Sequence, residues 1–164
     1  MADHVARIQA EWRRERPDVD VSPQGVIGRL HRLARFLTEE LVAVYERYGL
    51  AEGEFDVLCA LRRSGEPYQR QPAELARTTM ITTGAATKRL DRLEARGLLR
   101  REPDPEDARA KLVSLTPAGR ELIDAAFTEH MRNEARLLGR LSARDRSDLE
   151  RALTTWIGQF EAAE

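Results

Sequence analysis

Cysteine, aromatic residues and long apolar runs are scarce in this sequence. The single cysteine, Cys59, excludes an intramolecular disulfide and suits a reducing compartment. No apolar run approaches the ~18 residues of a transmembrane helix, and the first residues lack the apolar core of a signal peptide. Leucine, alanine, arginine and glutamate dominate, which favours a helix-rich soluble protein. We therefore expect a cytoplasmic protein about one domain long.

Patterns that would indicate an enzyme, a metal site or a bound cofactor are missing too. The sequence has no glycine-rich phosphate loop, nucleophile elbow or paired catalytic carboxylates. Its three histidines fall in three separate segments without ligand spacing, so a metal is not expected. Cys59 lies in the apolar run VLCAL without an adjacent base, which favours a small buried hydrophobe over an oxidation sensor.

Net charge is −1 and gives no argument for a nucleic-acid partner, but the local charge does. Residues 86–101 hold six basic side chains against two acidic ones. The basic ones are Lys88, Arg89, Arg92, Arg96, Arg100 and Arg101. Such clusters provide phosphate contacts, although alone this one fits a solvated helix face with internal ion pairs better. The segment that follows decides between the two interpretations.

Apolar residues recur every three or four positions in most of the chain, which predicts helices. A first short helix spans 3–16, and a longer one follows the cap and proline of Ser22-Pro23 and ends at Gly49. Further helices are predicted at about 53–63, 72–78, 83–96, from 117 after the cap Thr116, and 143–162.

A β-hairpin interrupts this helical pattern. Residues 98–102 and 111–115 read as short strands, and the polar segment PDPEDARA between them predicts an exposed tip. A helix pair followed by such a hairpin is a winged helix-turn-helix, which binds double-stranded DNA. The predicted fold is mainly α with a small β-wing, long N- and C-terminal helices and an extra N-terminal helix.

The second helix of a helix-turn-helix places its N-terminal residues in the major groove. Arg109 at the wing tip is placed to enter the minor groove, and Asp107 either orients it or pairs with it locally. Arg100 on the first wing strand is a further candidate contact. The predicted groove-facing residues of the recognition helix are Thr82, Thr83, Thr87 and Lys88.

The terminal helices carry more apolar surface than the central module can cover. We therefore predict a two-fold dimer through these helices, with a self-packed monomer as the alternative. One compact domain would then comprise the extra helix and first dimerisation helix (1–48), the DNA-binding lobe (49–116) and the C-terminal dimerisation helices (117–164).

The wing resembles that of the MarR family of transcription regulators. The family pattern D-x-R followed by L-T is matched by Asp107, Arg109, Leu115 and Thr116. The resemblance runs over roughly 49–121, and two positions depart from it: Met80, where the family often has glycine, and Ala108, where a second wing arginine is common.

Four residues resemble the urate-responsive branch of this family in particular. They are Trp12 in the extra helix, Asp56 in EFDVL, Arg89 in TKRLDRL, and Arg101 on the first wing strand. The resemblance implies that Trp12 stacks on a flat purine anion and that Arg89 binds it. The anion repels Asp56 or takes its ionic partner, which transmits ligand binding to the recognition helix through Arg89. Each residue also has an ordinary structural or phosphate-binding interpretation.

The predicted function is a homodimeric, sequence-specific repressor that binds an inverted-repeat operator. A small aromatic anion, urate or a related purine first, would release it. The alternatives are a MarR-type repressor that answers a phenolic carboxylate or antibiotic-like compound, and a protein–protein adaptor that uses the winged helix without DNA.

Overall fold

The computed structural model describes residues 2–79, 83–104 and 111–162, with only the backbone for 83–86. The chain divides into two compact units, Met1–Ala43 and Val44–Glu164, which are described separately below. Within the described ranges, no helix is long and apolar enough to cross a membrane. The first unit contains helix α1 (His4–Glu15) and most of α2 (Gln24–Arg47), and the second contains everything that follows.

Helix α1 packs against the start of α2 through small and polar residues. Asp3 caps α1 by accepting from the Ala6 amide at 2.8 Å, and its carboxylate also binds Arg29 of α2. A Cβ added at Gly28 would lie 3.2 Å from the Val5 side chain, so a glycine lets the two helices approach closely.

The predicted cap of α2 at Ser22 is wrong by one position. The helix begins at Gln24, and the Ser22 hydroxyl donates to the Asp20 carboxylate at 2.8 Å instead of capping. The amide of Ile27 donates to the Pro23 carbonyl, so Pro23 precedes the helix rather than opening it. The Asp20 carboxylate, two residues upstream, binds the Ser22 hydroxyl, which therefore does not cap the helix. Such local hydrogen bonds compete with capping and make serine caps hard to predict.

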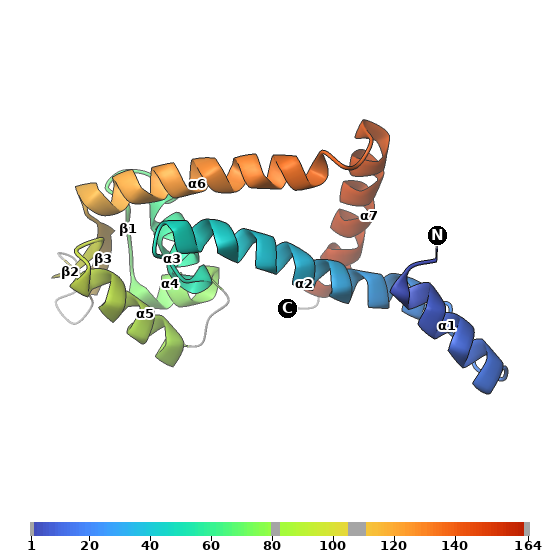
Figure 1. The fold of residues 1–164 in the computed structure, drawn as a ribbon. Helices are drawn as coiled ribbons and strands as arrows, with labels where there is room; N and C mark the ends of the chain where they lie inside the picture. The colour runs from blue at the N-terminus through green and yellow to red at the C-terminus, as the bar shows by residue number, and fades with distance from the viewer. Residues whose placement is uncertain (1, 80–82, 105–110, 163–164) are drawn as a thin grey trace. The chain divides into compact units, whose positions relative to one another are not determined.

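The second unit is a lobe of three short helices and a small sheet, followed by two helices. The helices are α3 (Glu52–Arg62), α4 (Pro72–Thr78), α5 (Thr83–Ala95), α6 (Pro117–Leu138) and α7 (Ala143–Glu161). Figure 1 shows α3, α4, α5 and the sheet gathered at the N-terminal end of α6, with α7 running away from its far end. The lobe core is mostly aliphatic: Leu58, Leu61, Leu75, Leu93, Val113 and Ile123 are all fully buried.

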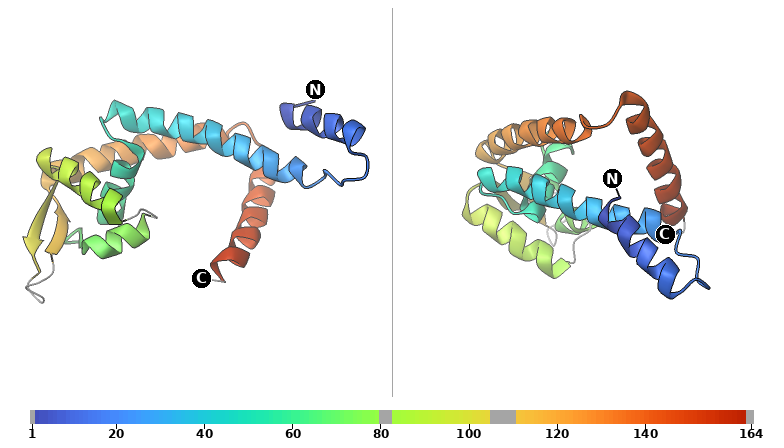
Figure 2. Two further views of the ribbon diagram at one scale, coloured as in Figure 1. Left: turned by 90° about the horizontal axis from the view of Figure 1, so that it is seen from below. Right: turned by 45° about the vertical axis from the view of Figure 1, so that its right-hand side comes forward.

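The wing is a three-stranded antiparallel sheet rather than the predicted pair. Strands β2 (Leu99–Pro103) and β3 (Lys111–Leu115) form the hairpin, which projects from the lobe in Figure 2. The two-residue strand β1 (Gln69–Arg70) adds to β3 and gives the order β1-β3-β2. A strand of two residues is too short to show an alternation of polar and apolar side chains, so β1 is recognised only by its pairing with β3.

The start of α6 confirms its predicted cap. The Thr116 hydroxyl accepts from the Gly119 amide at 3.0 Å, and Pro117 occupies the first turn. A Cβ at Gly119 would collide with the Leu98 carbonyl, so only glycine lets the helix start this close to the entrance of β2. The backbone at the start of α6 is thereby in direct contact with the backbone just before β2.

Candidate nucleic-acid interface

Helices α4 and α5 form the predicted helix-turn-helix. The Glu74 carboxylate accepts from the Gln71 amide at 3.1 Å, which fixes the first turn of α4. Leu75 of α4 and Leu90 and Leu93 of α5 are buried, so both helices are held by their apolar sides. The opposite side of α5 faces solvent.

The structure describes the side chains of only some of the predicted DNA contacts. Thr87 and Lys88 are exposed on α5, and Arg100 is exposed on β2, 3.3 Å from Glu102. Thr83 begins α5, but its side chain is not described. Three predicted positions lie outside the described residues: Thr82, Asp107 and Arg109. The contact roles of all of these residues stay predictions.

Much of the basic cluster at 86–101 makes contacts inside the lobe. Arg92 Nε donates to Glu54 Oε1 at 2.7 Å, and Arg96 lies 3.6 Å from the other carboxylate oxygen of Glu54. Arg96 also donates to the Gly49 carbonyl at 2.8 Å. These arginines therefore dock the recognition helix onto α3, a role that a count of charges in the sequence could not separate from phosphate binding.

Glu54 is the residue that sequence reasoning missed. It lies in the first turn of α3, is only 5% exposed, and accepts from the Ala51 amide at 3.0 Å. Burial raises the pKa of Glu54, but hydrogen bonds from Arg92 and the Ala51 amide outweigh it and hold the pKa below 4.5. The available signal was a glutamate at the third position of a helix, which is typical of a capping box.

Arg89 and Asp56 lie close together where α5 meets α3. A Cβ added at Gly53 would overlap the Arg89 guanidinium, so this side chain rests directly on the Gly53 backbone. Burial, and then Glu52, raise the pKa of Asp56, while the positive charge of Arg89 opposes the rise. The Arg89 guanidinium therefore rests on α3 one turn before Asp56, near enough to act on that poorly solvated carboxylate electrostatically.

Arg101 lies on a different side of α5. Its guanidinium is 2.6 Å from Asp91 and 3.2 Å from Glu94, and it also donates to the Thr87 carbonyl. At 100° per residue these three positions share one face, whereas Arg89 points from the opposite face. The structure thus places Arg89 against the start of α3, the helix that also carries Asp56, and Arg101 on the opposite side of α5. Trp12 belongs to the first unit and is 48% exposed.

The remaining reactive side chains make structural contacts. Burial, and then Asp56, raise the pKa of Cys59 to about 12, which keeps the thiol protonated and weakly nucleophilic. His130 is buried on the side of α6 that faces α3. Its Nδ1 lies 3.2 Å from the Tyr45 hydroxyl, and its Nε2 lies 3.2 Å from the Glu134 carboxylate. Among the described residues, no group of three potential metal ligands occurs.

Comparison with known proteins identifies the family. A MarR family model matches residues 48–110. The HTH-type transcriptional regulator PecS of Dickeya dadantii is 40% identical over 149 residues, which cover 91% of this chain and 90% of PecS.

Two solved structures are similar at the level of fold and sequence. An E. coli MarR mutant complexed with operator DNA has a TM-score of 0.70 and 27% identity, and covers 84% of this chain and 98% of its own. Bordetella bronchiseptica BpsR, whose DNA binding is regulated by 6-hydroxynicotinic acid, has a TM-score of 0.63 and 28% identity, with coverages of 78% and 98%. The chain belongs to the MarR family and is a winged helix-turn-helix, DNA-binding transcription regulator rather than an enzyme.

Proposed function

We propose that this regulator is a homodimeric repressor that a small aromatic anion, with urate or a related purine as the first ligand to test, releases from its operator. The observation that carries the proposal is the position of Arg89 over Gly53, one helical turn before Asp56, whose carboxylate its charge influences. Regulation of BpsR by 6-hydroxynicotinic acid supports an aromatic anion as the ligand class.

Arg89 couples the two binding events because it belongs to the recognition helix. A guanidinium binds a planar anion through a fork of donors, and it cannot keep its place over Gly53 while it does so. Asp56 then loses the positive charge that offsets its desolvation, so the resting arrangement of α3 and α5 is disfavoured. Ligand and operator affinities must therefore oppose each other by the same factor.

Helix α7 supports the dimer. Within the described residues, none of its side chains is buried, and Ile157 and Phe160 are 56% and 65% exposed. Together with Leu138 of α6, α7 lines an apolar hollow of about 850 Å³. An apolar stripe of this kind marks an interaction site, and a second copy of the chain would cover it. A two-fold dimer would place two recognition helices on an inverted repeat.

We expect Lys88→Ala to weaken operator binding about fivefold, because one exposed cation of α5 no longer meets the DNA. The slope of log affinity against log salt should also become shallower, by about 0.9 for each protomer. Fluorescence anisotropy over a salt series measures both quantities. Arg144→Ala, at an exposed arginine of α7, is the control. An unchanged slope in Lys88→Ala would remove Lys88 from the interface.

We expect Asp56→Asn to raise Tm by about 2 °C at neutral pH, while weakening the ligand response. The folded state raises the pKa of Asp56 above 3.8, the value expected for the unfolded chain. Ionisation of this carboxyl therefore lowers the stability of the fold as pH rises from the unfolded to the folded pKa. Scanning calorimetry at pH 7 and pH 3 measures the difference between variant and wild type. The gain should be present at pH 7 and absent at pH 3; a gain of equal size at both would exclude the ionisation of Asp56 as its cause.

The proposal is tested by anisotropy of the protein on its own upstream DNA, titrated in parallel with urate, xanthine, 6-hydroxynicotinate and salicylate. Release by the purines, lost in Arg89→Ala, is the expected result. Trp12→Ala is titrated beside it to decide whether the exposed ring of α1 contributes. Release by salicylate alone would favour a phenolic carboxylate, and an absence of DNA binding at modest salt would leave only the adaptor function.

A further inference from the structure

The aromatic ring of Tyr68 lies within cation–π distance of two guanidinium groups from different helices. The Arg62 Cζ atom, at the end of α3, is 5.0 Å from the ring centroid, and the Arg120 Cζ atom, in the first turn of α6, is 4.8 Å from it. Both separations fall within the range of cation–π attraction. Tyr68 immediately precedes β1, so this contact lies at the base of the wing.

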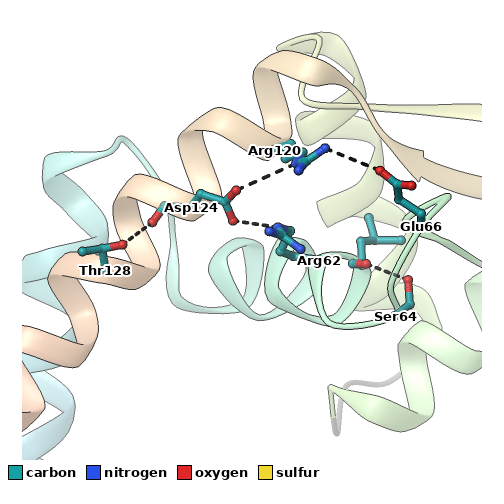
Figure 3. Close-up of polar contacts among 7 residues, drawn as sticks. Arg62, Ser64, Glu66, Arg120, Asp124 and Thr128 are labelled. Atoms are coloured by element: carbon teal, nitrogen blue, oxygen red, sulfur yellow. Dashed lines mark hydrogen bonds and ion pairs between the residues drawn. The ribbon is translucent and has the colours of Figure 1, made fainter.

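Asp124 of α6 holds both arginines in place. Its Oδ1 accepts from Arg62 Nε at 2.7 Å, and its Oδ2 is 3.9 Å from Arg120 Nε, as Figure 3 shows. Arg120 also approaches Glu66, in the turn before Tyr68, at 3.9 Å. We call Arg62, Tyr68, Arg120 and Asp124 the Tyr68 clamp.

The backbone of Tyr68 connects the clamp to the sheet. Its carbonyl accepts from the Leu115 amide at 3.1 Å, and the next residue, Gln69, pairs with Ser114 of β3. Tyr68 has a φ of 58°, in the left-handed region that a bulky side chain rarely occupies. Surrounding contacts must therefore hold this conformation, and the two guanidinium groups near the ring supply such contacts.

We propose that the Tyr68 clamp positions the wing against DNA, with Tyr68 and Asp124 acting through the sheet rather than by contact with DNA. The clamp fixes β1 to α3 and α6, β1 pairs with β3, and β3 carries the hairpin toward the tip. A small rotation at the base therefore becomes a larger displacement at the far ends of the strands, at Pro103 of β2 and Lys111 of β3. This inference rests on the proposed operator binding and on the minor-groove entry that the sequence predicts for the wing.

The test compares Tyr68→Leu with Tyr68→Phe. Phenylalanine keeps the aromatic face that attracts both arginines, whereas leucine keeps apolar volume without it. Two footprints on one operator separate the elements: hydroxyl radicals report the minor groove at the flanks, and dimethyl sulfate reports guanine N7 in the major groove. We expect Tyr68→Leu to lose flank protection and about fivefold in affinity, to keep the major-groove footprint, and Tyr68→Phe to behave as wild type.

A second variant guards against simple unfolding and against charge effects. Asp124→Asn removes a negative charge and by electrostatics alone would strengthen DNA binding, so a loss of flank protection in this variant reports positioning. Flank protection retained in both Tyr68→Leu and Asp124→Asn overturns the proposal, as does loss of both footprints together in variants with wild-type Tm. A wild-type protein that protects the major groove but not the flanks would refute the wing contact and the clamp's role, while leaving the repressor proposal intact.

Discussion

Ile157→Asp is expected to convert the protein into a monomer and to lower operator affinity by at least ~100-fold. Ile157 is 56% exposed on α7, at the centre of the apolar side that we assign to the second copy. A carboxylate buried there would be desolvated without a partner. A monomer carries one recognition helix and loses the simultaneous engagement of two half-sites. Sedimentation velocity and anisotropy measure the two effects.

Thr155→Asp is the matched control for this change. It adds the same charge to the same helix, at an exposed position about 200° away around the helix axis. This variant should remain dimeric and bind the operator as wild type does. If Ile157→Asp sediments as a dimer at micromolar concentration, α7 is not the dimer interface, and the apolar hollow beside it needs another occupant.

Glu54→Gln is expected to destabilise the protein by about 2 kcal/mol at neutral pH, because charge-assisted hydrogen bonds to a buried carboxylate are lost. Operator affinity should fall as well, since Arg92 and Arg96 no longer dock α5 on α3. Chemical denaturation and anisotropy measure the two losses. Glu52→Gln, at an exposed position in the same turn, should reproduce neither loss.

The loss in Glu54→Gln should depend on pH. The folded state holds the pKa of Glu54 below 4.5, so its stabilising contribution is fully present above that value and is lost as pH falls through the folded pKa. The difference between wild type and Glu54→Gln should therefore shrink in acid. A difference that stays constant from pH 7 into that range would show that the ionised carboxylate is not what stabilises the lobe.

Local signals in the sequence predicted most elements of the fold. Proline at position 72 and the cap Thr116 set the starts of α4 and α6, because both act within one turn. Strand β1 could not be predicted, because its pairing partner lies more than 40 residues away in β3. The Ser22 cap was wrong because Asp20 competes for the same hydroxyl.

The candidate site was predictable in composition but not in arrangement. The resemblance to the urate-responsive branch indicated Arg89 and Asp56, and the structure places Arg89 on Gly53, one helical turn before Asp56. Their role in ligand binding stays a prediction. The resemblance could not show that Arg101 pairs with Asp91 and Glu94 on the opposite face of α5. Nor could it show that Glu54 engages two arginines of the basic cluster, because that depends on how α3 and α5 pack.

We infer that an anion and the operator compete through Arg89, and a thermodynamic cycle measures this competition. The Kd of urate is measured by calorimetry for free and operator-bound protein, and the Kd of the operator is measured with and without urate. We predict that each ligand weakens the other by the same factor, at least about fivefold. The factor should approach one in Gly53→Ala, whose added methyl group occupies the resting place of the Arg89 guanidinium. Urate that binds free and operator-bound protein equally well would contradict the claim.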